Sequence, residues 1–128
     1  MENLKIPEGY QRVMPYLILA DAEKFLEFTE RVFGAKEKMK IMEENGGGVM
    51  HAEIVIGDSV IMVAESRGQW GPSPAGLYVY VENADETYQR ALEEGAAPVT
   101  ELSDQSYGRT GGVKDTNGNI WWIVSNPS

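Results

Sequence analysis

The chain repeats one order of elements twice, and this internal repeat constrains its fold more than any other feature. The matching positions lie 61 or 62 residues apart: Tyr16 with Tyr78, Asp21 with Asn83, Gly34 with Gly95, and Gly57 with Gly118. Each half reads as a strand, a helix and three strands. The repeat rests on order and spacing, since few residues are identical between the halves. It predicts two modules of one architecture.

In the first half, residues 13–20 are short and apolar and predict a strand. Asp21 is typical of a helix N-cap, an amphipathic segment follows it, and Gly34 is typical of a helix end. Further strands are predicted over 37–43, 49–56 and 59–65. The glycine-rich stretch 45–48 between the first two predicts a hairpin turn. It lacks the Lys-Ser/Thr ending of a phosphate-binding loop.

The second half begins after a stretch rich in Gly, Pro and Ser. Its predicted elements are a strand at 77–81, a helix capped by Asn83 and ended by Gly95, short strands at 99–102 and 111–114, a turn at 115–119 and a strand at 120–124. The chain is therefore predicted to be one domain, 1–128, with a first module at 12–65, a linker at 66–76 and a second module at 77–125.

The composition excludes several classes of function. The 128 residues carry a formal net charge of -9, which disfavours nucleic-acid binding and suits a neutral or cationic ligand. There is no cysteine, which excludes disulfides and thiolate metal sites, and His51 is the single histidine. No apolar run is long enough to cross a membrane, and no secretory signal is visible, so we expect a cytoplasmic protein.

Five stretches carry a resemblance to a known family: Pro15–Asp21, Val32–Ala35, His51–Met62, Leu77–Tyr88 and Asp104–Ile123. In this order they resemble the vicinal oxygen chelate superfamily of glyoxalase I, bleomycin-resistance proteins, fosfomycin-resistance enzymes and extradiol dioxygenases, and within it the PhnB-like branch. The resemblance implies an α+β fold of two βαβββ modules whose curled mixed sheets form a cleft. It also implies a homodimer.

Metal-dependent members of that superfamily place His, Gln or Glu in the first and last strands of each module. The matching positions here hold Met14, Gly76 and Trp122, and either Ile61 or Met62. None of these is a normal ligand for a divalent metal that prefers carboxylate or imidazole. The resemblance therefore predicts the fold without its usual metal site, and no cofactor is expected.

Strand alternation predicts which side chains line the cleft instead. If Met14 faces the cleft, so does Tyr16, and the same holds for Tyr78 and Tyr80 in the second module and for Trp122 in its last strand. Such a surface suits a planar or aromatic ligand through stacking and hydrogen bonds. The alternative is that these aromatic residues only pack the core.

His51 and Glu53 are predicted to point away from the apolar face of their strand, toward the cleft. A histidine beside a carboxylate can form a general acid–base pair, so these two residues are the catalytic candidates. They could also ligate a metal outside the usual pattern, with Glu65 as a distant third ligand. The simplest interpretation is a hydrogen-bonded pair that steadies the sheet or a dimer contact.

Three further residues are candidates for ligand binding. Tyr107 and Arg109 flank a glycine near the predicted cleft mouth, where a guanidinium could meet a carboxylate or phosphate. Arg109 could equally pair with Asp104 or Asp115. Trp70, in the linker, could cover the cleft or lie in a dimer interface.

Two functional hypotheses remain open. The first is a bleomycin-resistance-like protein that binds a small aromatic or cationic organic molecule without a metal. The second is a divalent-metal-dependent lyase, isomerase, transferase or dioxygenase of the same superfamily, with the metal held by His51, Glu53 or a partner chain. Whether the chain is an enzyme stays undecided at this point.

Overall fold

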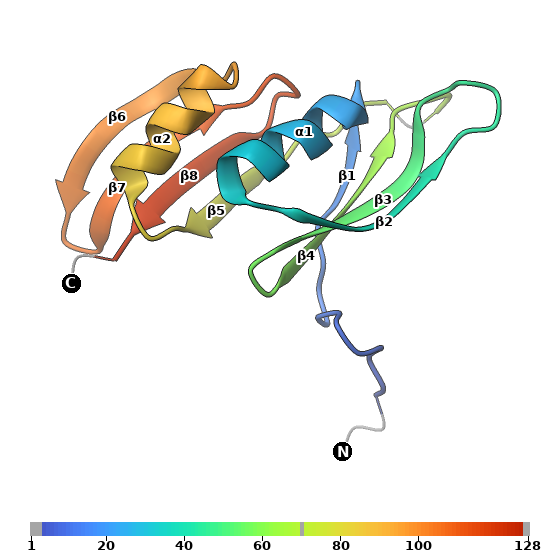
Figure 1. Ribbon diagram of the computed structural model, residues 1–128, viewed down its shortest axis with the longest axis horizontal. Coiled ribbons are helices and arrows are strands. Elements are labelled where there is room, and N and C mark those ends of the chain that lie inside the picture. Colours follow the sequence, from blue (N-terminus) through green and yellow to red (C-terminus); the bar gives the residue numbers. More distant parts are fainter. Residues whose placement is uncertain (1–3, 70, 127–128) are drawn as a thin grey trace.

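The computed structural model describes residues 4–69 and 71–126, and it confirms the repeated βαβββ architecture (Figure 1). The first module contains β1 (Tyr16–Leu19), α1 (Ala22–Phe33), β2 (Lys36–Met42), β3 (Val49–Ile56) and β4 (Ser59–Glu65). The second contains β5 (Gly76–Tyr80), α2 (Ala84–Glu93), β6 (Ala97–Gln105), β7 (Gly108–Lys114) and β8 (Ile120–Ser125).

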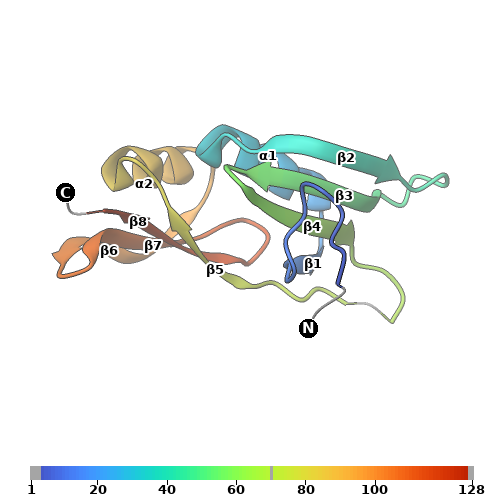
Figure 2. The same ribbon diagram turned by 90° about the horizontal axis from the view of Figure 1, so that it is seen from below.

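Each module forms one four-stranded mixed sheet, and the strand order is the same in both. The orders are β1-β4-β3-β2 and β5-β8-β7-β6, with the first two strands of each order parallel and the others antiparallel. Each helix packs against strands of its own sheet. The other face of each sheet carries no helix, and we call these the open faces (Figure 2).

Two strands of the second module are longer than the sequence predicts. We expected short strands at 99–102 and 111–114, whereas β6 and β7 extend over Ala97–Gln105 and Gly108–Lys114. Apart from Ala97 and Pro98 at the start of β6, the extra residues are polar or glycine, so they show no hydrophobic alternation. In β6 they join the sheet because this is an edge strand, where polar side chains face solvent while the backbone still pairs with β7. In β7, Arg109 and Thr110 pair with β6 on one side and β8 on the other.

A shared aromatic core joins the two modules. Trp121 of β8 stacks on Phe25 of α1, with ring centroids 6.2 Å apart, and its ring lies 4.5 Å from that of Phe33. Phe25 and Trp121 are fully buried. The side chains that bury the first helix therefore come partly from the last strand of the chain.

A turn of the second module also holds the first module in place. The buried carboxylate of Asp115 accepts hydrogen bonds from Trp121 Nε1 at 2.8 Å and from Asn119 Nδ2 at 3.0 Å. It also accepts the backbone N–H groups of Asn117 and Asn119, both at 2.9 Å. The amide of Asn117 donates in turn to the carbonyls of Ala20 and Asp21, at the start of α1. The predicted turn is thus also a connection between modules.

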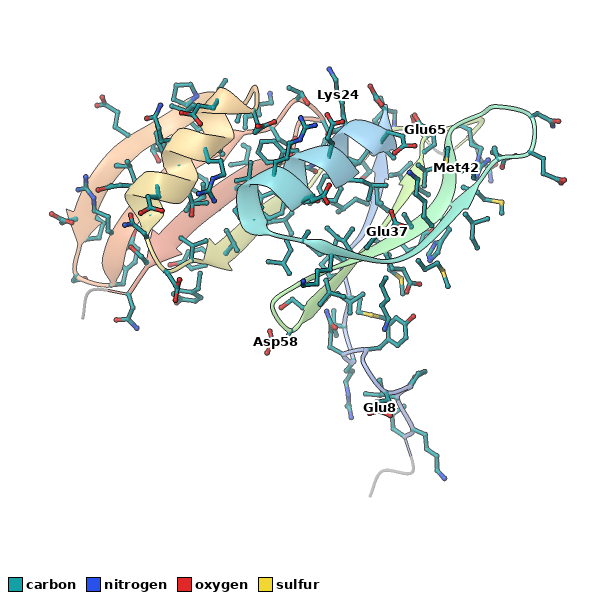
Figure 3. All side chains as sticks on the ribbon, in the orientation of Figure 1. Glu8, Lys24, Glu37, Met42, Asp58 and Glu65 are labelled. Atoms are coloured by element: carbon teal, nitrogen blue, oxygen red, sulfur yellow. The ribbon has the colours of Figure 1, made fainter. Side chains whose placement is uncertain are left out.

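The N-terminus of α1 is capped by a distant side chain. Asp21 occupies the predicted N-cap position, but its φ is 60° and its side chain makes no capping hydrogen bond. Glu65 of β4 supplies the acceptors instead, taking the N–H of Asp21 at 2.7 Å and that of Ala22 at 3.1 Å (Figure 3). The expectation that the Asp21 side chain caps the helix is wrong. Asp21 has a left-handed backbone and makes no capping hydrogen bond, and the Glu65 carboxylate accepts the N–H groups at this end of the helix instead.

We expect Glu65→Ala to lower the free energy of unfolding by about 1–2 kcal/mol, the usual cost of losing a cap. The matched control is Glu27→Ala, which removes an exposed glutamate of α1 whose ion pair with Arg31 spans 3.5 Å. Its loss is expected to cost less than about 0.5 kcal/mol. Urea denaturation of both variants checks the prediction, and equal effects would contradict the capping role.

Across residues 4–69 and 71–126, neither helix has the length and apolar character needed to span a bilayer.

Candidate functional site on the open sheet faces

The open face of the first sheet carries the two catalytic candidates. Ala52 and Ile54 of β3 are buried in the core, as predicted, and His51 and Glu53 alternate with them. Met50, which the same alternation predicts to be buried, is 40% exposed near the start of the strand. The sheet register places Met62 opposite Glu53 and also opposite Tyr16. His51, Glu53, Met62 and Tyr16 therefore share one face.

A continuous chain of hydrogen bonds crosses this face. Tyr10 Oη donates to Glu53 Oε1 at 2.6 Å, and His51 Nε2 lies 2.8 Å from Glu53 Oε2. The other ring nitrogen, His51 Nδ1, lies 3.3 Å from Tyr16 Oη. Glu53 is only 4% exposed, so both of its oxygens are held by side chains in a largely dry environment.

Sequence reasoning missed Tyr10. It lies in segment 4–14, the N-terminal arm, which leaves β1 on the side away from α1 (Figure 1). Gln11 fixes this arm by donating to the carbonyl of Val60 at 2.9 Å and accepting from the N–H of Val60 at 3.3 Å. No periodic pattern marks these contacts. The one local signal is that Tyr10 is the single aromatic residue of this arm.

The pKa of Glu53 reflects competing effects. Burial alone raises the pKa of this carboxyl group, but hydrogen bonds from Tyr10 and His51, with the charges of His51 and Lys38, bring it below its ordinary value. The hydrogen bond to Glu53 raises the pKa of the Tyr10 hydroxyl. Glu53 is therefore a stable anion that can act as a hydrogen-bond acceptor or counter-ion.

We expect this anion to make stability depend on pH. The pKa of Glu53 lies below 4.5 in the folded chain, so the unfolded chain takes up the proton first. The stabilisation is complete above the unfolded pKa and is lost as the pH falls through the lower, folded pKa. The stability difference between wild type and Glu53→Gln should therefore be constant near neutral pH and shrink as the pH falls below the ordinary glutamate pKa of about 4.3. Urea denaturation at each pH measures it. Glu8→Gln, in the exposed arm (Figure 3), is the matched control. A difference for Glu53→Gln that does not change with pH would refute the prediction.

The open face of the second sheet is aromatic. Tyr78 and Tyr80 are 53% and 69% exposed, and their rings meet edge to face with centroids 5.5 Å apart. Trp122 pairs with Tyr78 in the register, so it shares this face, and its ring lies over Gly112. Partial burial and the neighbouring Tyr80 and Tyr107 hydroxyls raise the pKa of Tyr78. The Tyr78 phenol is therefore a neutral hydrogen-bonding group at neutral pH.

The structure divides the predicted cleft residues between two sheets. Tyr16 lies on the first sheet and Met14 just before it, whereas Tyr78, Tyr80 and Trp122 lie on the second. A cavity of about 1180 Å³ between the modules includes Tyr78 and Tyr80 in its lining, with Phe33 and Trp121. Met14 lines a different cavity of about 490 Å³, between the N-terminal arm and the first sheet.

Arg109 has an internal role. Its guanidinium pairs with Asp85 at 3.0 Å and with Asp104 at 3.4 Å. The first partner was not predicted, and of the two predicted alternatives the pairing with Asp104 is correct. Asp115 is instead enclosed by the donors of its own turn. Tyr107 is exposed at the adjoining turn, and Trp70 lies outside the described residues.

The residues at the family's metal positions do not fit a divalent metal. The register settles the open alignment choice in favour of Met62, because Tyr16 pairs with Met62 as Tyr78 pairs with Trp122. These positions therefore offer a thioether and an indole rather than carboxylate or imidazole. Glu65 is occupied at the start of α1. Within the described part of the chain, no three His, Cys, Asp or Glu side chains are grouped to hold a metal ion.

Comparisons with known proteins agree with this fold. Residues 10–123 match the family model described as Glyoxalase/Bleomycin resistance protein/Dioxygenase superfamily. The uncharacterized protein Mb0911c of Mycobacterium bovis is 30% identical over 119 residues, covering 84% of this chain and 78% of that protein.

Two solved structures share the fold at low sequence identity. The PhnB protein of Bacillus cereus, described as a putative 3-demethylubiquinone-9 3-methyltransferase, has a TM-score of 0.72 at 21% identity, covering 90% of this chain and 99% of that one. TnmS3, an antibiotic binding protein from Streptomyces sp. CB03234, has a TM-score of 0.70 at 17% identity, covering 91% and 99%. With a family model matched over most of its length, the chain belongs to the glyoxalase/bleomycin resistance protein/dioxygenase superfamily.

Proposed function

We propose that this protein binds a small aromatic or cationic organic molecule on its open sheet faces, without a metal ion or other cofactor. The observation that carries the proposal is the exposure of Tyr78 and Tyr80, at 53% and 69%, on a face shared with Trp122. Large aromatic side chains on an uncovered sheet face indicate a surface that binds a partner. Rings and phenol hydroxyls together recognise a flat molecule through stacking and hydrogen bonds.

Charge favours a cationic ligand over an anionic one. The formal net charge of -9 attracts cations over a distance of roughly one Debye length, about 8–10 Å. TnmS3, which shares the fold, is described as an antibiotic binding protein. We extend this to the present chain only as a class of ligand, a drug-like organic molecule that is bound and left unchanged.

We further propose that the complete site forms in a homodimer in the cytoplasm. The aromatic residues of the second sheet and the polar residues of the first lie on different sheets of one chain, and a second copy could bring two such faces together. The lack of cysteine agrees with a reducing compartment.

The test uses a cationic planar probe, proflavine, and tryptophan fluorescence of the full chain. We expect Tyr80→Ala and Trp122→Ala each to weaken proflavine binding about tenfold, a loss of about 1.4 kcal/mol. The matched control is Val99→Ala, which removes an exposed apolar side chain from β6. Equal affinities for wild type, Trp122→Ala and Val99→Ala would overturn the proposed site.

A metal-dependent enzyme is the second candidate, and the His51–Glu53 contact of 2.8 Å favours it. A partner chain would have to add the remaining ligands. Elemental mass spectrometry after incubation with Mg, Mn, Fe, Ni and Zn decides between the two. About one metal per wild-type chain, lost in His51→Ala, would support the enzyme and overturn metal-independent binding. A metal content near zero would overturn the metal-dependent enzyme hypothesis.

A further inference from the structure

We propose that the open face of the first sheet contains a phenol-binding site, and that Tyr10 of the N-terminal arm occupies it in the free protein. A phenolic ligand would displace Tyr10 and take over its contacts. This inference rests on the proposed function in one respect, since both assume that the open faces bind aromatic molecules. It adds a ligand class and a second location, on the first sheet rather than the second.

The hydroxyl position of the site is defined by Glu53. Its Oε2 atom is held by His51, whereas Oε1 accepts only from Tyr10, at 2.6 Å, among the hydrogen bonds of the described residues. A hydroxyl that donates to a carboxylate makes a short, strong bond, typically about 2.5–2.7 Å. Without Tyr10, a buried anionic oxygen would face outward with no donor, so any phenol that reached it would be favoured.

The ring position has its own partner. Lys38 Nζ lies 4.7 Å from the centroid of the Tyr10 ring, a cation–π contact that any electron-rich ring could make. Lys38 also lowers the pKa of Glu53, which keeps the acceptor charged. The sheet thus supplies an acceptor for the hydroxyl and a cation for the ring face, and neither contact depends on the backbone of the arm.

Space for the rest of a ligand lies beside Tyr10. The cavity of about 490 Å³ is lined by Tyr10, by Met14 and Met62, and by apolar residues of the arm such as Leu4 and Ile6. Thioether side chains adapt to different ring shapes and contact aromatic rings favourably. A ligand larger than phenol could therefore extend into this cavity when it displaces the Tyr10 side chain and the rest of the arm stays in place.

Side-chain contacts rather than strand pairing hold the arm to the sheet. Residues 4–14 contain no helix or strand; Tyr10 bonds to Glu53, and Gln11 bonds to the Val60 backbone. Tyr10 then acts as a tethered competitor. The apparent affinity for a free phenol equals the affinity of the vacant site multiplied by the fraction of molecules in which the arm is away from it. Weakening the arm should raise that affinity.

The experiment measures binding of 4-methylphenol to the full chain by isothermal titration calorimetry, with toluene as the matched probe that lacks the hydroxyl. We expect Tyr10→Ala to bind 4-methylphenol about tenfold tighter than wild type. The double variant Tyr10→Ala/Glu53→Gln should bind 4-methylphenol about tenfold more weakly than Tyr10→Ala, because the acceptor loses its charge. Toluene should bind Tyr10→Ala about tenfold more weakly than 4-methylphenol.

Gln11→Ala provides a second route that leaves Tyr10 and Glu53 intact. It loosens the arm, so its affinity for 4-methylphenol should lie between those of wild type and Tyr10→Ala, and this keeps the test decisive if Tyr10→Ala folds poorly. The inference is overturned if neither variant binds more tightly than wild type, or if toluene binds as well as 4-methylphenol. Proflavine binding and its loss in Trp122→Ala form a separate readout, so this inference and the proposed function can fail independently.

Discussion

Replacing Asp115 with alanine is expected to lower the free energy of unfolding by about 3–5 kcal/mol, a large part of the 5–15 kcal/mol typical of a domain. The substitution removes a buried carboxylate that accepts Trp121 Nε1, Asn119 Nδ2 and two backbone N–H groups. Each buried donor left without an acceptor costs about 1–3 kcal/mol, and the losses are not additive because the donors share one turn. The same turn places Asn117 on the carbonyls before α1, so the contact between modules should weaken as well.

The control is Asp58→Ala in the corresponding turn of the first module. Asp58 is exposed between β3 and β4, and its one side-chain hydrogen bond described here is the 3.4 Å contact with Ser59. Its replacement should change stability by less than about 0.5 kcal/mol. Urea midpoints and slopes of the two variants measure the difference. A loss below about 1 kcal/mol for Asp115→Ala would show that water satisfies the exposed donors.

The second large effect is expected for Trp121→Ala, with a loss of about 3–5 kcal/mol. Trp121 is 1% exposed and fills the space between the modules against Phe25 and Phe33. Its truncation leaves a cavity that the two modules can close only by shifting relative to each other. Because Trp121 also donates to Asp115, the double variant with Asp115→Ala should lose less than the sum of the single losses.

The matched control is the next residue in the chain. Trp122 is half-buried on the open face, so Trp122→Ala should cost only about 1 kcal/mol while it weakens proflavine binding. Thermal or urea unfolding and fluorescence titration on the same two proteins separate the roles. If Trp121→Ala and Trp122→Ala lowered the free energy of unfolding equally and weakened proflavine binding equally, the assignment of Trp121 to the core and Trp122 to the ligand surface would be wrong.

Much of the fold could be predicted because its signals are local. The alternation of Ala52 and Ile54 with His51 and Glu53 correctly assigned each side chain to its face, since a strand turns its side chains to opposite sides at every residue. The helix end at Gly34 was correct because a left-handed residue with φ 69° closes the helix there. Strand β6 was predicted too short because its sequence does not alternate between hydrophobic and polar residues over its full length.

The sequence by itself determined the two repeated modules and the alternating faces of their strands, and it placed Trp122 and either Ile61 or Met62 at the family's metal positions. The choice of Met62 came from the strand register. The tertiary structure alone decided which distant groups meet. Tyr10 reaches Glu53 across 43 residues, Glu65 caps a helix that begins 43 residues earlier, and Asn117 binds the carbonyl of Ala20 across 97 residues. Hydrophobic periodicity records only which side of an element is buried. The choice of polar partner depends on how the modules and the arm are placed, and no local pattern encodes that placement.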